Sequence, residues 1–283
     1  MNTMKKLILF VLVASSALKV WSQSSCCEVL TSKQNTLLAL NKDFAKIHME
    51  PLPFTLPNPK GEMITFNSRD GKSGSAYLVR SPKGGSRYLF VFHEWWGLND
   101  YIKREAEHFR EELGDVNVLA IDLYDGKVAS TREEAQKLVS ELDNARAMAI
   151  IKGACDFTGE GAKIASMGWC MGGSWSLQAA LTGGGNAIGC VIYYGYPEMN
   201  EDKLKKLRCD ILGIFGDKDQ YITPEVVEKF NAKLKESGKQ MTMYHYDADH
   251  AFANPSNPNH DAVATKDAWM KTIGYLKEKF QVK

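Results

Sequence analysis

Gly168-Trp169-Cys170-Met171-Gly172-Gly173 follows an apolar run, 163–169, which predicts a strand, and opens a segment, 171–181, which predicts a helix. Glycine on both sides of Cys170 permits a sharp strand-to-helix turn that exposes the central side chain above a sheet. The start of a helix favours a thiolate, and it directs the N–H of Met171 to where an oxyanion would form. We therefore interpret Cys170 as a nucleophile. The alternative is a glycine-rich turn that holds a buried cysteine.

Strands and helices alternate on both sides of this turn. Strands are predicted at 63–67 and 75–80, as a hairpin, and then at 88–93, 117–122, 163–169, 188–195, 209–215 and 241–246. Helices are predicted at 31–48, 131–152, 171–181, 224–236 and 261–280. This order predicts an α/β fold with a mostly parallel, doubly wound sheet of about eight strands flanked by helices. A Rossmann nucleotide-binding fold is disfavoured, because no Gly-x-Gly-x-x-Gly follows the first parallel strand.

Residues 1–22 have the pattern of a signal peptide. Lys5 and Lys6 precede a short apolar run, and Val20 and Ser22 suit cleavage after Ser22. The run is shorter than the about 20 apolar residues that span a bilayer, so we expect export to the periplasm or the medium and no membrane span. An alternative is a lipoprotein acylated at Cys26, although no aliphatic residue stands at the expected place before it. Residues 23–60 are then an extension with a proline-rich link, and 61–283 form one catalytic domain.

The composition is that of a globular protein with balanced charge. Hydrophobic residues make up 44% and charged residues 24% of the 283, and 35 Lys and Arg balance 34 Asp and Glu. No basic stripe indicates nucleic acid, and no His-x-x-x-His or Cys-x-x-Cys cluster indicates a metal, so we expect neither, and no cofactor. If Cys170 stays free, five of the 6 cysteines remain, an odd number that predicts no disulfide framework. Cys190 and Cys209 lie in apolar runs, where a free thiol packs as a small core residue.

An acid and a histidine follow Cys170 in a meaningful order. Asp217 and Asp219 come directly after the strand at 209–215, and His250 lies between the last strand and the last helix. Nucleophile, acid and histidine in this order are typical of hydrolases whose nucleophile sits on such a turn. We therefore expect His250 to act as the base, with either aspartate as its partner. The other histidines do not occupy such a position in the chain order and are interpreted as structural: His48, His93, His108, His245 and His260.

With these residues the chain resembles the dienelactone hydrolase family of α/β-hydrolases, from about Gly61 to Phe280. The motifs that carry the resemblance are the cysteine turn, His93-Glu94-Trp95-Trp96-Gly97, Asp122-Leu123-Tyr124, the Gly-x-x-Asp that ends at Asp219, and His250-Ala251-Phe252. The resemblance implies that Asp219, not Asp217, is the acid. It also implies that Glu94 holds the resting thiol and helps transfer its proton, and that the Trp95 N–H joins that of Met171 as an oxyanion hole.

The chain departs from the family where dienelactone would be held. Members that open this lactone bind its carboxylate with two arginines, whereas the corresponding stretches here read Asp125-Gly126-Lys127 and Ala253-Asn254-Pro255. Lys127 could supply a point charge but not the two-pronged contact of arginine. We therefore expect a pocket for an apolar or aromatic ester, with these substrate-binding residues: Trp96, Tyr124, Lys127, Trp175, Tyr221 and Phe252.

Together these features predict a monomeric hydrolase of small-molecule esters or lactones that works through a thioester on Cys170. A thioesterase or peptidase with the same three residues is the first alternative. The second is a catalytically silent binding protein, since a fold does not fix a function. The complete set of nucleophile, acid and histidine argues against silence.

Overall fold

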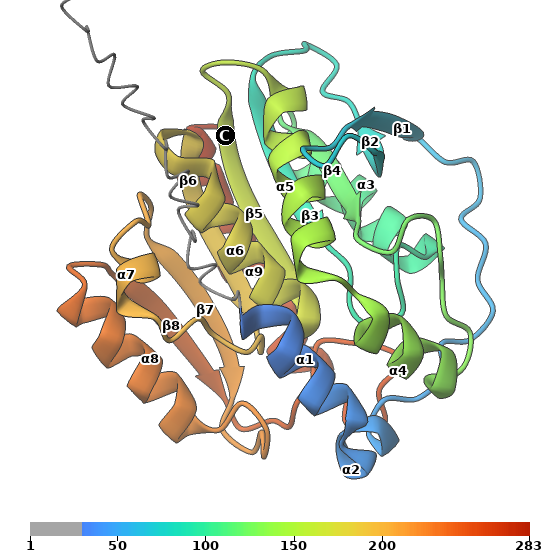
Figure 1. Ribbon diagram of the computed structural model, residues 1–283, viewed down its shortest axis with the longest axis vertical. Coiled ribbons are helices and arrows are strands. Elements are labelled where there is room, and N and C mark those ends of the chain that lie inside the picture. Colours follow the sequence, from blue (N-terminus) through green and yellow to red (C-terminus); the bar gives the residue numbers. More distant parts are fainter. Residues whose placement is uncertain (1–29) are drawn as a thin grey trace, which may run out of the picture.

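One mixed sheet of eight strands organises residues 30–283, which the computed structural model describes (Figure 1). The strands lie in the order β1-β2-β4-β3-β5-β6-β7-β8. Their bounds are β1 (Glu62–Asn67), β2 (Ser73–Val79), β3 (Arg87–Phe92), β4 (Asn117–Asp122), β5 (Lys163–Trp169), β6 (Ala187–Tyr193), β7 (Ile211–Gly216) and β8 (Met241–Tyr246). β1, β2 and β4 pair antiparallel, and every pairing from β4 to β8 is parallel. The predicted fold class is confirmed.

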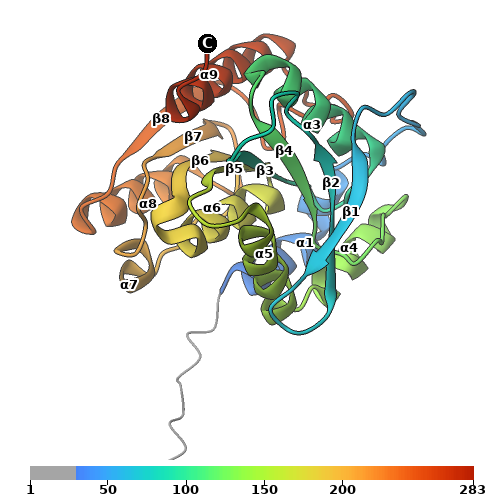
Figure 2. The same cartoon turned by 90° about the horizontal axis from the view of Figure 1, so that it is seen from above.

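Helices cover both faces of the sheet (Figure 2). On one face lie α3 (Asp100–Leu113) and α9 (Ala262–Phe280), and on the other α5 (Asn144–Thr158), α6 (Met171–Gly183) and α8 (Pro224–Glu236). The short elements are α1 (Leu30–Leu40), α2 (Lys42–Lys46), α4 (Arg132–Glu141), α7 (Glu201–Leu204) and a 3-10 turn (Gly184–Asn186). Central strands are apolar on both sides: Leu89 and Val91 of β3 face α3 and α9, while Phe90 and Phe92 face α5 and α6.

Two helices predicted from the sequence are each divided in the structure. The helix predicted over 131–152 is two helices, because Leu142 is extended and Asp143 begins α5 by accepting a hydrogen bond from the Ala145 N–H at 2.9 Å. Likewise the helix predicted over 31–48 is divided into α1 and α2, where the Asn41 side chain caps α2. In both places a polar side chain accepts from a backbone N–H two or three residues further along, and this cap starts a new helix within an otherwise helical pattern.

Helix α3 was not predicted. Its buried side chains Ile102, Ala106, Phe109 and Leu113 recur every three or four residues, which is a helical period, and Asn99 caps its start. The helical period of α3 is therefore readable in the sequence between the strands at 88–93 and 117–122. Helix α3 forms one wall of the cleft described below.

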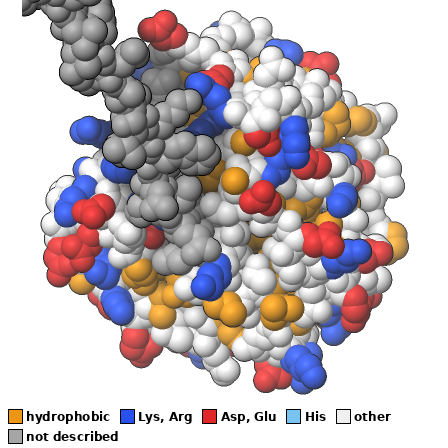
Figure 3. All heavy atoms as spheres, in the orientation of Figure 1, with side chains coloured by type: hydrophobic (Ala, Val, Ile, Leu, Met, Phe, Trp, Pro, Cys, Tyr) orange, Lys and Arg blue, Asp and Glu red, His pale blue; other side chains and the backbone are white. Residues whose placement is uncertain are grey.

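Charged side chains of both signs are interspersed over the face shown in Figure 3, in keeping with the balanced composition. From residue 30 onward, none of the helices is long and apolar enough to cross a membrane. Within the same residues the cysteines carry free thiols: Cys155, Cys170, Cys190 and Cys209. The predicted signal peptide, Cys26 and Cys27 lie outside the described residues.

Candidate active site

Cys170 occupies a sharp turn between β5 and α6. Its backbone has φ 52° and ψ −121°, a left-handed conformation that L-residues rarely adopt, and its N–H donates to the Tyr193 carbonyl at 2.9 Å. A side chain on Gly172 would collide with the carbonyl oxygen of Phe92, and one on Gly168 with the backbone of Gly172. The two glycines therefore allow α6 to start directly against the ends of β3 and β5, with Cys170 at its first turn.

A hydrogen-bonded chain links Cys170 to His250 and Asp219. Nε2 of His250 lies 3.3 Å from Sγ of Cys170, and its Nδ1 lies 2.7 Å from Oδ2 of Asp219. The second carboxylate oxygen, Oδ1, accepts from the backbone N–H groups of Tyr221 and Ile222 at 2.8 and 2.9 Å. Asp219 is thus fixed by the turn after β7, and it in turn fixes the orientation of the imidazole.

The same geometry shows which aspartate is the partner of His250, a choice that the order of residues along the chain left open between Asp217 and Asp219. Asp217 is exposed, and its Oδ1 lies 3.0 Å from Nδ1 of His245 on β8. Asp219 is 3% exposed and faces His250. The chain turns at Asp217 and Lys218, so the two aspartates point to different partners, which their spacing in the sequence cannot reveal.

The charged forms of His250 and Asp219 are both favoured in this buried pair. Burial by itself lowers the pKa of His250, but the charges and hydrogen bonds of Asp219 and Cys170 outweigh it and raise that pKa to about 10. Burial raises the pKa of Asp219, and the positive imidazole with the two backbone donors outweighs this, so the net shift is downward. The arrangement therefore favours an imidazolium between a carboxylate and a sulfur.

The two residues that the resemblance assigns to an oxyanion hole lie in segments that pack together. Met171 is the first residue of α6, and Trp95 follows Phe92 and His93 at the end of β3, against whose carbonyl oxygens Gly172 packs. Within residues 30–283 neither N–H donates to another backbone carbonyl. The neighbouring His93 is buried and structural: its Nε2 accepts from the Leu123 N–H at 3.2 Å, so its Nδ1 donates to the Glu94 carbonyl at 2.6 Å. The loop that carries Glu94 and Trp95 is thereby anchored to β4.

Glu94 is buried but does not bond to the thiol here. Its Oε2 accepts from the Asn254 amide at 2.8 Å, and its Oε1 has no partner among the described residues. Burial raises the pKa of Glu94 to about 7, against the opposing effects of His250 and Asn254. The expectation that Glu94 holds the resting thiol is therefore not met in this conformation, because Asn254 holds its carboxylate and His250 bonds to the sulfur instead.

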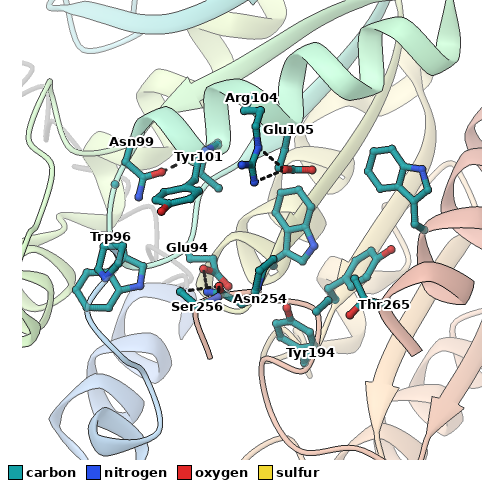
Figure 4. Close-up of a pocket in the computed structure, with 18 residues that line it drawn as sticks. Glu94, Trp96, Asn99, Tyr101, Arg104, Glu105, Tyr194, Asn254, Ser256 and Thr265 are labelled. Atoms are coloured by element: carbon teal, nitrogen blue, oxygen red, sulfur yellow. Dashed lines mark hydrogen bonds and ion pairs between the residues drawn. The ribbon is translucent and has the colours of Figure 1, made fainter. Parts of the chain in front are cut away.

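An apolar cleft lies beside the nucleophile turn, since Trp169 belongs to its lining (Figure 4). Cys170, His250 and Asp219 are not themselves among the lining residues. The space is about 900 Å³ with its opening to solvent included, and Glu94, Tyr194 and Asn254 form part of the lining. The Tyr194 ring lies 5.1 Å from that of His250, so this residue connects cleft and triad. Further aromatic residues line the cleft: Trp96, Tyr101, Trp169, Tyr193 and Trp269. Such a lining suits an aromatic or aliphatic group.

Of the six predicted substrate-binding residues, Trp96 lines the cleft. Lys127 is exposed and absent from the lining, so its place there was wrongly predicted. Tyr221 is half-buried outside the cleft, where its ring packs edge-on against Phe44 at 4.8 Å. Both follow turns, and the direction of a turn side chain depends on the segment that packs over it.

The remaining three are core residues, contrary to the prediction. Trp175 and Phe252 are fully buried, and Tyr124 is 5% exposed. The Tyr124 hydroxyl donates to the Met171 sulfur at 3.3 Å, so it supports the nucleophile turn from behind. Large aromatic rings near a site gain most free energy by filling the core, which explains why proximity in sequence misplaced them.

Sequence reasoning missed the α3 side of the cleft. Figure 4 shows Arg104 and Glu105, on α3, across the cleft from Glu94 and Asn254. The Arg104 guanidinium bonds to the Glu105 carboxylate at 3.1 Å and lies 5.3 Å from the Tyr101 ring centre. This cation is therefore already paired. Recognition of the helical pattern at 100–113 would have placed these side chains on one element.

His48 was also missed, and it comes from the extension. It is 3% exposed, its Nδ1 bonds to the Phe44 carbonyl at 2.8 Å, and its ring lies 5.6 Å from that of His250. Burial, with the positive His250 nearby, lowers the pKa of His48 to about 3, so the imidazole is neutral. No sequence signal connects His48 with Cys170, since 121 positions separate them and only the packing of α2 brings them together.

Several proteins resemble this chain. Protein usf of Aquifex pyrophilus is 29% identical over 231 residues, which are 77% of this chain and 98% of that protein. A carboxymethylenebutenolidase from a Pseudomonas strain is 25% identical over 232 residues, 76% of this chain and 94% of its own. The curated relatives are thus matched over nearly their whole length.

Solved structures share the fold. A dienelactone hydrolase-like promiscuous phosphotriesterase from metagenomic libraries superposes with a TM-score of 0.67 at 20% identity, covering 77% of this chain and 98% of that one. An esterase of Pyrococcus furiosus superposes with a TM-score of 0.58 at 14% identity, covering 82% and 99%. The model of the dienelactone hydrolase family matches residues 75–280. This chain therefore belongs to the dienelactone hydrolase family and is a hydrolase of ester or lactone bonds.

Proposed function

We propose that the protein hydrolyses neutral aryl or short-chain esters through a thioester on Cys170, with His250 as base and Asp219 as its orienting acid. The observation that carries this proposal is the continuous chain of short contacts, 3.3 Å from sulfur to imidazole and 2.7 Å from imidazole to carboxylate. Nucleophile, base and orienting group in hydrogen-bond contact are what covalent acyl transfer requires.

The reaction follows from this contact order. His250 already holds the proton of the pair when Sγ of Cys170 attacks the ester carbonyl, and the N–H groups of Met171 and Trp95 stabilise the negative oxygen that forms. The alkoxide leaves with the proton from His250, and a thioester remains. His250 then takes a proton from the water that attacks the thioester, the acid departs, and Cys170 with the protonated His250 is restored.

The aromatic cleft favours an uncharged substrate. The cationic side chain in its lining, Arg104, is paired with Glu105, and Lys127 lies outside the lining, which supports the proposal of a neutral substrate. Each charge-assisted hydrogen bond is worth about 1.5–3 kcal/mol, so two missing ones correspond to roughly a hundredfold or more in specificity.

We therefore predict that dienelactone is cleaved with a lower kcat/KM than its own methyl ester, measured at the lactone bond, because the cleft lining offers its carboxylate no unpaired cation. The methyl ester is the matched control, because it keeps the scaffold and removes the charge. Glu105→Gln frees Arg104 and should narrow the gap. Preference of the wild-type protein for the anionic lactone would contradict the proposal of a neutral substrate, because a cationic group would then have to bind the carboxylate.

Glu94 gives a prediction about pH. Because its pKa is raised to about 7 from an ordinary 4.5, the native state retains a proton that the unfolded chain loses between these values. The free energy of unfolding therefore falls as pH rises through this window, by about 3 kcal/mol at most. Glu94→Gln should remove this part of the pH dependence, measured by urea unfolding at pH 4.5 to 8.

The same variant tests whether Glu94 acts on the thiol. Above pH about 7 the ionised Glu94 stabilises the neighbouring imidazolium, so the alkylation rate of Cys170 should show a step near that pH. In Glu94→Gln the step should vanish. Identical alkylation profiles for the two proteins would reduce Glu94 to a structural partner of Asn254.

We further propose that the protein is exported, on the pattern of residues 1–22. The mature chain is expected to begin at Gln23, and N-terminal sequencing of protein from its native host measures this. A chain that still starts at Met1 would remove the proposal, and a lipid-modified Cys26 would replace cleavage after Ser22 by the lipoprotein route.

A further inference from the structure

His48 brings a third metal-binding side chain to the nucleophile. One ligand atom from each of His48, Cys170 and His250 lies within 4.8 Å of the other two, and all three residues are buried. Since Nδ1 of His48 bonds to the Phe44 carbonyl, Nε2 is the nitrogen that remains available. This Nε2 is buried and has no hydrogen-bond partner among residues 30–283. A buried polar atom without a partner costs free energy unless something else engages it.

Both imidazoles are held as metal ligands are held. His250 is oriented by the Asp219 carboxylate at 2.7 Å, and His48 by a backbone carbonyl at 2.8 Å, each through Nδ1. A carboxylate or carbonyl on the second ring nitrogen fixes the tautomer and directs the other nitrogen to a metal, which is the usual outer shell of zinc-binding histidines.

The distances suit zinc after a small adjustment. Tetrahedral zinc with imidazole and thiolate ligands separates the ligand atoms by roughly 3.3–3.6 Å. The separation between Cys170 and His250 is already 3.3 Å, and the 4.8 Å bound limits the closure needed at His48 to about 1.5 Å. Thiolate and imidazole select zinc over magnesium and calcium, which prefer oxygen ligands.

We propose that His48, Cys170 and His250 form a site for a zinc ion, which binds reversibly and stops turnover. The proton that His250 holds for the pair leaves to solvent as the sulfur–zinc bond forms, which frees the Nε2 lone pair of His250. His48 gives its own Nε2 lone pair, and water takes the fourth position. Binding rests on the geometry above, whereas inhibition rests on the proposed function, because it removes both nucleophile and base. The segment before β1, which lies outside the family match at 75–280, thereby supplies the third zinc ligand, His48, to the site.

The test measures metal binding apart from activity. Reduced, metal-free protein is titrated with Zn²⁺ by calorimetry and with Co²⁺ by absorption, since a thiolate–cobalt charge-transfer band reports the sulfur ligand. We expect one metal per chain, no binding of Mg²⁺ at the same concentration, and loss of the band in Cys170→Ala. His48→Gln should weaken Zn²⁺ binding at least tenfold, and His48→Cys should restore much of it with a thiolate.

His245→Gln is the matched control, because His245 lies exposed on β8 with Asp217 and should leave zinc affinity and ester turnover unchanged. Zinc affinity in a folded His48→Gln equal to that of wild type would overturn the proposal, since Cys170 and His250 alone would then bind the ion. If His48→Gln does not fold, His48→Cys decides, because a second thiolate on Co²⁺ should strengthen the charge-transfer band, and an unchanged band would overturn the proposal. Full ester turnover in Cys170→Ala would instead refute the proposed function and leave the cobalt result standing.

Discussion

Cys170→Ala is expected to lower kcat/KM for an activated aryl ester by ~10⁴-fold or more, as loss of a nucleophile does in other acyl-transfer enzymes. Without the sulfur no thioester forms, and the oxyanion donors alone provide only residual rate. Cys170→Ser should retain a trace, because a hydroxyl needs a stronger base than a thiol. Hydrolysis of a p-nitrophenyl ester measures each variant. Wild-type turnover in the alanine variant would remove covalent catalysis by this residue.

Cys190→Ala is the matched control, since this thiol is fully buried in the core away from the cleft. Burial raises the pKa of Cys190 to about 12 and that of Cys155 to about 11, so both stay protonated at neutral pH. Iodoacetamide should therefore label Cys170 first, and the loss of activity should follow the modification of that one residue. Inactivation that tracks another cysteine would contradict the assignment.

Asp219→Asn is expected to reduce kcat by roughly 10³–10⁴-fold with little change in fold. The amide can no longer stabilise an imidazolium, so the pKa of His250 should fall from its raised value of about 10, and the imidazole loses its fixed tautomer. The pH profile of kcat, with the His250 ring signal by NMR, measures both effects.

Asp217→Asn tests the neighbouring carboxylate in the same assay. Its partner is the exposed His245, so turnover should stay within about twofold of wild type, as for most surface substitutions. A larger loss in Asp217→Asn than in Asp219→Asn would exchange the roles of the two residues and contradict the geometry.

Local sequence was enough to predict the sheet and the position of the nucleophile. The apolar runs at 117–122 and 163–169 coincide with strands β4 and β5, because a buried parallel strand needs a continuous apolar segment whatever surrounds it. The turn at Cys170 was readable for a similar reason: only glycine at 168 and 172 permits the backbone to approach so closely. The chain order of nucleophile, acid and histidine then followed from the parallel topology.

Only the tertiary structure decided what surrounds the nucleophile. It placed Asn254 on Glu94, turned Trp175 and Phe252 into the core, and brought Arg104 and His48 to the site from α3 and the extension. Each of these outcomes depends on which way a side chain points and which distant segment packs over it. Such choices are set by the packing of the whole core and not by the period of any one segment. The sequence by itself therefore determined Cys170 and the order of its partners, and tertiary packing alone determined the cleft and the second imidazole at the nucleophile.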